Sequence, residues 1–320
     1  MHPSGWITEM ENSMVKKIIV RVDDVGYTPV NNSGAFEVFD NGIGTAADVM
    51  LDTPGTEDAL RRLRDYPWLS IGWHTHFWGS PVLGAEAVPS LVNPDTGHFR
   101  SDLNRIKDDS IRYDELIAEM EAQMGRCISI LGKVPDTAEI MEPEDTWFAK
   151  AKLRTCKKYG IVTNFAKRVR MDRDGKVTLT AVDPKWERCN IYWMDPGPAY
   201  QALRTDSIEA MGAYDPVKYY TEDHGHMNDF PEEGVFGQAW HPGYVDYYMC
   251  RLGDQGPHAR KFLECRPLDT HALCSEEIKN WIRENRIELM SFTDALYGRR
   301  DFQNHLRAVG SDLCVLDLDE

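Results

Sequence analysis

Acidic and imidazole side chains follow the ends of several strands that the sequence predicts. Asp23 and Asp24 come directly after a short β-branched run, and His74 follows a second apolar run. His241 follows a third. Because the strands of βα folds end at one shared edge, we expect these side chains to form a single site. Carboxylate and imidazole groups together can bind a divalent cation and move protons, which indicates a metal centre capable of acid–base catalysis.

The spacing within these groups suggests divided roles. Two adjacent carboxylates at a strand end point in different directions, so one of Asp23 and Asp24 can bind a cation while the other handles a proton. His74 and His76 would share one face if the strand continues, within reach of a single metal ion. A bare Asp-Asp pair is also typical of a loop cap, and a lone histidine is often structural.

The segment His241-Pro242-Gly243 turns sharply after an apolar strand. A histidine held on such a turn suits general acid catalysis, because its unperturbed pKa is about 6.5. Asp246 would either orient the imidazole ring or cap the following turn. A surface histidine on an ordinary turn is the alternative that the pattern leaves open.

The elements that position these residues alternate along the chain. Apolar β-branched runs predict strands, and amphipathic stretches predict helices, with Thr56 placed to cap one of them. The predicted strands cover residues 16–22, 42–50, 69–75, 134–141, 160–166, 234–239 and 287–291, and the predicted helices cover 31–41, 56–65, 112–131, 144–159 and 276–285. Such repeated βα units imply a parallel sheet with helices outside it, closed into a barrel or doubly wound.

Residues 76–110 are rich in Pro and Gly and lack a strong period, which predicts a long functional loop. Since no linker or internal repeat is visible, we expect one domain over residues 15–320 and a loosely ordered extension over residues 1–14. This extension lacks the basic start and apolar core of a secretory signal, and no apolar run approaches the roughly 20 residues of a membrane span. We therefore expect a cytoplasmic protein.

The charge balance restricts the partners. The chain has 52 acidic and 36 basic residues, which give a net charge of −16. This field repels phosphate backbones, so nucleic acid and anionic membranes are poor partners, whereas a neutral substrate is compatible with it. The seven cysteines include no C-x-x-C pair, so neither a zinc knuckle nor a redox motif is indicated.

An ordered series of motifs resembles the YdjC-like family of carbohydrate deacetylases, also called the chitooligosaccharide deacetylase group. Val22-Asp23-Asp24-Val25-Gly26 is similar to the strand-end Asp-Asp-Phe-Gly of that family, and Ile71-Gly72-Trp73-His74 is similar to its Gly-Leu-His. Gly132-Lys133-Val134-Pro135-Asp136 and His241-Pro242-Gly243 follow in the expected order. The resemblance spans about residues 16–297, and the series is more specific than any single motif.

The resemblance implies a single-domain (β/α) barrel, incomplete with seven strands, and one divalent cation at the strand ends, with zinc, magnesium and manganese all open. It implies that Asp23 is the general base that activates a water molecule, and that Asp24 and His74 bind the metal. His241 would protonate the leaving amine or stabilise the tetrahedral oxyanion. These roles imply hydrolysis of the N-acetyl group, or another N-acyl group, of an amino sugar or oligosaccharide.

One position departs from the family pattern. After Pro135-Asp136 the family usually has a histidine that is a third metal ligand, and here Met141 stands in its place. Methionine is a poor ligand for such ions. We expect Glu139 to supply the ligand, since it would share a strand face with Met141. His76 and Glu142 are the alternatives, and loss of the metal is a further one.

Aromatic and charged residues around the strand ends are expected to bind the sugar, with the tryptophans stacking on its ring or simply packing. The predicted substrate-binding residues are Trp73, His76, Trp78, Trp240, Asp246 and Arg266. The expected partner is a small carbohydrate, and the resemblance alone suggests a homodimer. Two alternatives keep the barrel: a different amide hydrolysis or a sugar lyase or isomerase reaction at the same metal site, and a catalytically silent sugar-binding protein.

Overall fold

The computed structural model describes residues 16–75, 77–171, 177–194, 214–222, 227, 233–250 and 257–316. The extension predicted for residues 1–14 and the candidate ligand His76 lie outside the described residues. Within the described ranges, no helix combines the length and the hydropathy that a bilayer span requires.

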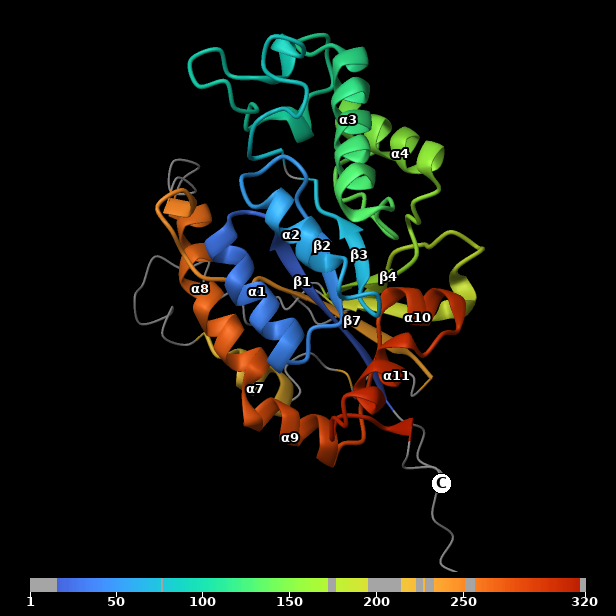
Figure 1. The fold of residues 1–320 in the computed structure, drawn as a ribbon. Helices are drawn as coiled ribbons and strands as arrows, with labels where there is room; N and C mark the ends of the chain where they lie inside the picture. The colour runs from blue at the N-terminus through green and yellow to red at the C-terminus, as the bar shows by residue number, and fades with distance from the viewer. Residues whose placement is uncertain are drawn as a thin grey trace, which may run out of the picture.

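A mostly parallel sheet has β1 (Lys17–Val25) at its centre (Figure 1). On one side, β1 pairs with β2 (Ala46–Val49), which pairs in turn with β3 (Ser70–Trp73). On the other side, β1 pairs along most of its length with β7 (Val235–Trp240). The short strand β8 (Glu288–Leu289) pairs with the first residues of β1. All four pairings are parallel, so the strands around β1 end at one edge.

The sheet continues beyond β7 through β6 (Ile191–Met194) to β4 (Lys167–Met171), and both pairings are again parallel. The last strand, β5 (Val177–Leu179), is antiparallel to β4. The predicted α/β fold with a mostly parallel sheet is therefore confirmed.

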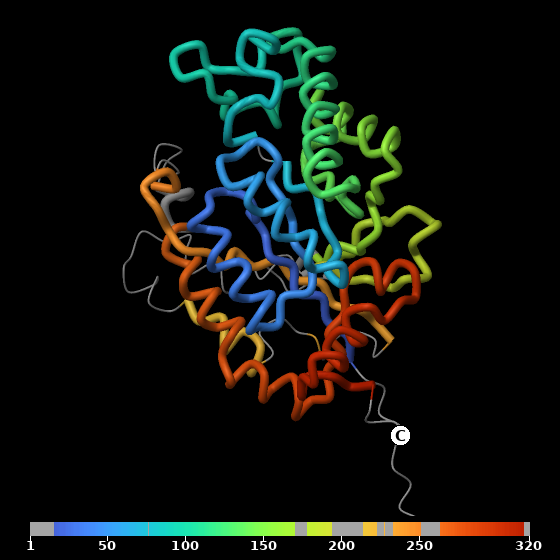
Figure 2. Tube along the Cα trace, viewed as in Figure 1, coloured from blue at the N-terminus to red at the C-terminus, as the bar shows by residue number. Residues whose placement is uncertain are grey.

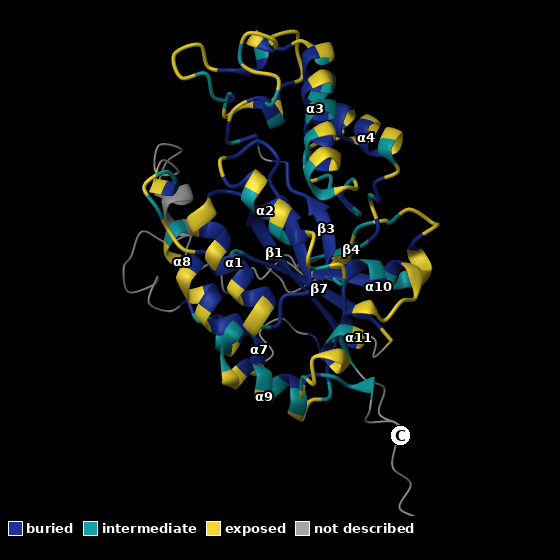
Figure 3. Cartoon of the chain, in the orientation of Figure 1, coloured by how far each residue is buried: buried dark blue, intermediate teal, exposed yellow. Residues whose placement is uncertain are grey.

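The strand β1 is buried on both faces, which explains its continuous apolar sequence. Ile18 packs in the main hydrophobic core, whereas Ile19 packs in a second core on the opposite face, with Trp193 and Phe292. Because side chains alternate along a strand, Arg21 and Ile19 share a face. Figure 3 shows buried strands enclosed by helices whose outer faces are exposed.

The helices lie around the sheet. α1 (Pro29–Asn41) follows β1 and packs against α8 (Pro257–Cys274), while α2 (Thr56–Leu63) follows β2. At one end of the molecule, α3 (Tyr113–Leu131) packs against α4 (Trp147–Tyr159) (Figure 2). The remaining described helices are α7 (Pro216–Thr221), α9 (Glu276–Glu284), α10 (Phe292–Tyr297) and α11 (Asp301–Ala308).

Two predicted strands differ from the structure. Residues 134–141 form no strand, and only Thr137 makes isolated parallel bridges, to Gly72 of β3 and to Val162. The strand predicted for residues 160–166 is likewise reduced to the bridge at Val162, and β4 begins later, at Lys167. The premise that Glu139 shares a strand face with Met141 is therefore wrong.

The predicted cap of α2 is also wrong by one residue. Gly55 is the N-cap, and Thr56 is the first helical residue. The hydroxyl of Thr56 donates to the carbonyl oxygen of Met50 at 2.9 Å, so it ties the helix to the end of β2. The long loop is present as predicted: residues 77–112 contain two short 3-10 helices but neither an α-helix nor a strand.

Replacing Gly72 with alanine should damage the edge of the sheet where Asp48 lies. Gly72 is paired with Asp48 of β2, and a Cβ added at Gly72 would lie 1.7 Å from Asp48 Oδ1. We expect Gly72→Ala to lower the free energy of unfolding by about 1–3 kcal/mol, because the methyl group must displace that carboxylate. Urea denaturation measures the effect.

Gly125→Ala is the matched control, because an added Cβ at this exposed position of α3 meets nothing within 4 Å. It should raise the free energy of unfolding by about 0.5–1 kcal/mol through helix propensity. Similar effects of the two substitutions would contradict the assigned close contact.

Candidate functional site

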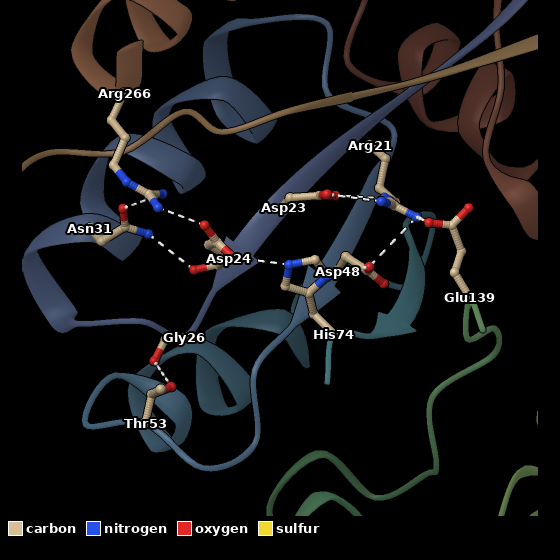
Figure 4. A network of polar contacts seen from close by, with 10 residues as sticks. All are labelled: Arg21, Asp23, Asp24, Gly26, Asn31, Asp48, Thr53, His74, Glu139 and Arg266. Atoms are coloured by element: carbon tan, nitrogen blue, oxygen red, sulfur yellow. Dashed lines mark hydrogen bonds and ion pairs between the residues drawn. The ribbon is translucent and has the colours of Figure 1, made fainter. Parts of the chain in front are cut away.

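The carboxyl end of β1 turns its two aspartates apart. The pairing of β1 with β2 shifts register between Val22 and Val25, and Asp24 has a left-handed backbone with a φ of 60°. Asn31 of α1 supports this conformation by donating its side-chain amide to the carbonyl oxygen of Asp24 at 3.1 Å. As Figure 4 shows, Asp23 and Asp24 consequently face different partners.

Asp24 lies between a guanidinium and an imidazole. Arg266 of α8 donates Nη2 to Asp24 Oδ2 at 2.6 Å, and Nε2 of His74 lies 2.9 Å from Asp24 Oδ1. Burial opposes ionisation of this carboxyl group, but Arg266 and His74 hold its pKa well below the usual range. Asp24 is therefore a fixed negative charge that a cation can share with His74.

His74 is oriented by a second carboxylate. Its Nδ1 lies 2.8 Å from Oδ2 of Asp48 on β2, so the ring is held between Asp48 and Asp24. Burial opposes a positive charge on His74, but the attraction of Asp23 and the hydrogen bonds to Asp24 and Asp48 raise its pKa to about 10. The two flanking carboxylates therefore favour the protonated form of this imidazole.

Asp23 faces the opposite way, toward Arg21 of the same strand. Nε of Arg21 donates to Asp23 Oδ1 at 2.5 Å and Nη2 donates to Oδ2 at 2.8 Å. Burial raises the pKa of Asp23 to about 6, although Arg21 and His74 oppose the shift. A carboxylate with such a pKa can accept a proton near neutral pH.

The donors at this edge fit a divalent cation. One donor atom from each of Asp23, Asp48 and His74 lies within 4.8 Å of the others, and all three residues are buried. We call these residues the three-donor group. On the other side of the imidazole, Asp24 Oδ1 and His74 Nε2 form a second pair of donors, the Asp24–His74 pair. Carboxylate oxygen and imidazole nitrogen suit zinc, manganese and related ions.

The predicted third ligand, Glu139, lies beyond Arg21. Its Oε2 is 2.8 Å from Arg21 Nη1, and its Oε1 is 2.8 Å from Nη2 of Arg168. Glu142, one of the two alternatives, lies 3.8 Å from the ammonium group of Lys152, and Met141 is 55% exposed. Metal binding by either glutamate stays a prediction.

The turn at His241 is held by α8. Asp269 accepts the backbone N–H of His241 at 2.9 Å, and Thr270 Oγ1 accepts that of Gly243 at 2.9 Å. Burial lowers the pKa of His241 to about 3, with Asp24 opposing the shift and Arg266 adding to it. His241 is therefore uncharged at neutral pH.

The residues predicted to bind substrate differ in their accessibility. Trp73 and Trp240 are 1% and 0% exposed, and their indole N–H groups donate to Gln123 and to Tyr220. This burial fits packing better than stacking on a sugar. Arg266 is also fully buried, against Asp24.

Two other predicted substrate-binding residues lie near the surface. Trp78 is half-buried and packs edge-on against Tyr27, with ring centroids 5.8 Å apart. Asp246 accepts the backbone N–H of Met249 at 3.0 Å, so it caps the turn after His241. Trp78 remains accessible to a ligand, whereas Asp246 has a local structural role.

Two hollows lie outside the centre, and neither is lined by Asp23, Asp24, Asp48 or His74. A cavity of about 790 Å³ lies beside Glu139 and Arg168 and is also lined by Met141. A second, of about 690 Å³, is lined by Trp78 and by residues of the long loop, including His98. Either hollow has room for a small-molecule substrate.

The chain matches one family of known proteins along most of its length. A match to the family described as YdjC-like protein covers residues 17–284. The chain belongs to the YdjC-like family. The resemblance inferred from its ordered motifs is thereby confirmed.

The curated relatives of this YdjC-like chain include carbohydrate deacetylase 2 of Listeria innocua, which is 24% identical over 87% of the chain and 98% of that relative. A chitooligosaccharide deacetylase of Serratia marcescens is 30% identical over 122 residues, which are 38% of this chain and just under half, 47%, of that relative. A solved structure from Enterococcus faecalis, described as a putative cellobiose-phosphate cleavage protein, is similar in fold. It has a TM-score of 0.58 and 22% identity, and the match covers 88% of this chain and 99% of that one.

Sequence reasoning missed Arg21, Asp48 and Asp269. Asp48 is the one charged residue in the apolar run of residues 46–51, and a carboxylate near the end of a predicted strand could have identified it. Arg21 interrupts an apolar strand in the same way. Asp269 gave no such signal, because it lies on a helix whose sequence does not identify the buried face.

Removing the guanidinium of Arg266 should destabilise the protein strongly. Arg266→Gln leaves Asp24 buried without its closest cation, which is expected to cost about 3–5 kcal/mol in the free energy of unfolding. Arg61→Gln is the control, because Arg61 pairs with Glu57 on the exposed surface of α2. That change should cost less than about 0.5 kcal/mol. Equal losses in urea denaturation would contradict the role given to Arg266.

Asp269 should make stability depend on pH. Burial raises its pKa to about 7, against the hydrogen bonds from Tyr214 and His241. The folded protein therefore binds this proton more tightly than the unfolded chain, whose aspartate pKa is about 3.9. Its stabilising contribution is complete below about pH 4 and is lost as the pH rises to about 7, by at most about 1.4 kcal/mol per pH unit.

Asp269→Asn removes this titration. As the pH rises from 4 to 7, the free energy of unfolding of the wild type should therefore fall relative to that of the variant. Denaturant unfolding of both proteins across this range measures the difference, and parallel curves would overturn the assignment.

Proposed function

We propose that this protein is a metal-dependent carbohydrate deacetylase that removes an N-acetyl group, or another N-acyl group, from an amino sugar or oligosaccharide. The main support is the buried centre of Asp23, Asp24, Asp48 and His74 at the carboxyl edge of the parallel strands. Membership of the YdjC-like family and the names of two relatives, one a carbohydrate deacetylase and one a chitooligosaccharide deacetylase, support the reaction and the substrate class.

The Asp24–His74 pair is the proposed cation site. Asp48 fixes the ring of His74 through Nδ1, which leaves Nε2 directed at Asp24 Oδ1. Arg266 binds the other oxygen of Asp24 and so holds the carboxylate in place. A divalent cation bound here would supply a Lewis acid for the amide carbonyl. Binding it requires His74 to release its proton, so affinity should rise with pH.

Asp23 is the proposed general base. Its pKa of about 6 leaves it mainly ionised at neutral pH but basic enough to accept a proton from water. The bidentate contact with Arg21 fixes its direction. A water molecule beside Asp23 would then attack the carbonyl carbon as its proton passes to the carboxylate. Asp23 would hand that proton to the leaving amine as the C–N bond breaks.

His241 is the proposed stabiliser of the oxyanion. Its neutral imidazole, held by the turn that Asp269 and Thr270 fix, can donate one N–H to the oxygen on which charge develops. A pKa of about 3 disfavours a stored proton on His241 before the reaction. The oxyanion role is therefore better supported than donation to the leaving amine.

We further infer that the sheet closes into a seven-stranded barrel. Thr137 bridges Gly72 of β3 to Val162, and the chain runs from Val162 into β4, which pairs with β6. Around the sheet, the strands then follow in the order β1, β2, β3, the segment at Thr137, the segment from Val162 into β4, β6 and β7. Since β7 pairs with β1, this order returns to its start. A closed ring would place all these strand ends around one cavity.

The proposed partner is a small carbohydrate, and assembly as a homodimer remains a proposal.

The decisive test is release of acetate. The purified protein, loaded with manganese or zinc, should release acetate from at least one N-acetylated monosaccharide or oligosaccharide. Removal of the metal with a chelator should abolish the release, and added metal should restore it. Absence of acetate from every sugar tested, with metal bound, would refute the deacetylase function.

His241→Asn tests the oxyanion role in the same assay. We expect kcat to fall by about 10²–10³ with little change in KM, the loss typical of one oxyanion donor. His305→Asn is the control. His305 lies on the outer helix α11, where its ring stacks on Trp68, so this substitution should leave kcat unchanged. A similar small effect of both substitutions would remove His241 from the mechanism.

A further inference from the structure

Arg21 lies among the donors of the three-donor group. Its side chain is only 5% exposed, and it contacts both oxygens of Asp23 at 2.5 and 2.8 Å. Its Nη1 also lies 3.6 Å from Asp48 Oδ2 and 2.8 Å from Glu139 Oε2. The guanidinium carbon lies 4.3 Å from the ring centroid of Trp193. The guanidinium is therefore held by three carboxylates and an aromatic face.

Charge in the centre is almost balanced by protein groups. The carboxylates of Asp23, Asp24, Asp48 and Glu139 face the guanidinium groups of Arg21, Arg168 and Arg266. Once His74 has released its proton, as cation binding requires, four negative and three positive groups leave a formal charge of −1, which a divalent cation would change to +1. Without Arg21 the charge would be −2, which a divalent cation neutralises. Because unbalanced buried charge is costly, Arg21 opposes cation binding.

We propose that Arg21 is an internal cation that fills the three-donor group and keeps Asp23 out of the metal's coordination. With Arg21 in place, both oxygens of Asp23 are engaged, and a metal ion is left with the Asp24–His74 pair. Without Arg21, the oxygens of Asp23 and Asp48 become additional ligands. This inference rests on the proposed function, because it takes a divalent cation as the ligand of the site. It explains how Asp23 stays available as a base.

The test measures manganese affinity of the metal-free protein by calorimetry at pH 7.5, with no substrate present. Arg21→Gln should bind Mn²⁺ at least about tenfold more tightly than the wild type, or bind it where the wild type shows no binding, a gain of about 1.4 kcal/mol or more. Asp23→Asn should change the wild-type affinity by less than about threefold but should abolish the gain in the Arg21→Gln background.

Arg168→Gln is the matched control. This substitution also removes one positive charge from the centre, at the guanidinium that pairs with Glu139. It frees no oxygen of Asp23 or Asp48. We expect it to raise the affinity by less than about threefold, because Arg168 contacts Glu139 rather than Asp23 or Asp48 and its removal opens no new ligand position. The proposal is overturned if Arg21→Gln gains nothing, if both arginine variants gain equally, or if Asp23→Asn lowers the wild-type affinity tenfold.

Loss of folding and loss of deacetylase activity can each be distinguished from a change in manganese affinity. Arg21→Gln leaves a buried carboxylate with fewer partners, so circular dichroism and thermal unfolding must accompany the binding data. If that variant does not fold, the comparison of the wild type with Asp23→Asn decides: unchanged affinity supports the proposal, and a tenfold loss or more overturns it. Failure to release acetate, with the affinity pattern intact, would refute the deacetylase function alone.

Discussion

Burial of carboxylates at the carboxyl end of β1 governs the structure around it. Asp23, Asp24 and Asp48 are 4%, 1% and 3% exposed, and an ionised carboxylate costs several kcal/mol to bury without a partner. Each of them therefore contacts a positively charged group. Arg21 contacts Asp23, Arg266 contacts Asp24, and His74 lies between Asp24 and Asp48. The strands can converge here only because these cationic groups converge with them.

The helix α8 supplies much of this support. Arg266, Asp269 and Thr270 lie three and four residues apart, so they occupy one face of the helix. That face binds Asp24 at the end of β1 and the turn from His241 to Gly243 after β7. Two neighbouring strands are thus fixed relative to each other by one helix. Arg266 also lowers the pKa of both neighbouring groups. It thereby favours the charged form of Asp24 and the neutral form of His241.

The two sides of His74 give the centre a functional asymmetry. On the Asp24 side, the carboxylate and the imidazole nitrogen face each other at 2.9 Å. On the Asp23 side, the guanidinium of Arg21 already holds the carboxylate oxygens. A metal ligand and a proton acceptor need different environments, and the adjacent residues Asp23 and Asp24 have them. The alternation of side chains along β1 makes this division possible, because it points neighbouring side chains to opposite faces.

The sequence alone predicted the mostly parallel sheet, the first strands and helices, and the placement of His74 and His241 directly after strands. It did not predict β4, β5, β6 or α8, and Asp23 and Asp24 lie within the last residues of β1 rather than after it. The predicted features follow from local patterns of apolar residues and from motifs of a few adjacent residues. Local patterns were insufficient at residues 134–141, where the predicted strand is reduced to the bridge at Thr137.

Only the tertiary structure decided which charges meet. One partner of Asp24 is Arg266, 242 residues further along the chain, and the indole N–H of the buried Trp240 of β7 donates to Tyr220 of α7. Arg21 and Asp48 interrupt apolar strands, and nothing in their own segments shows that they contact each other and Asp23. Pairing of buried charges depends on distances between elements, which packing sets and local periodicity does not encode.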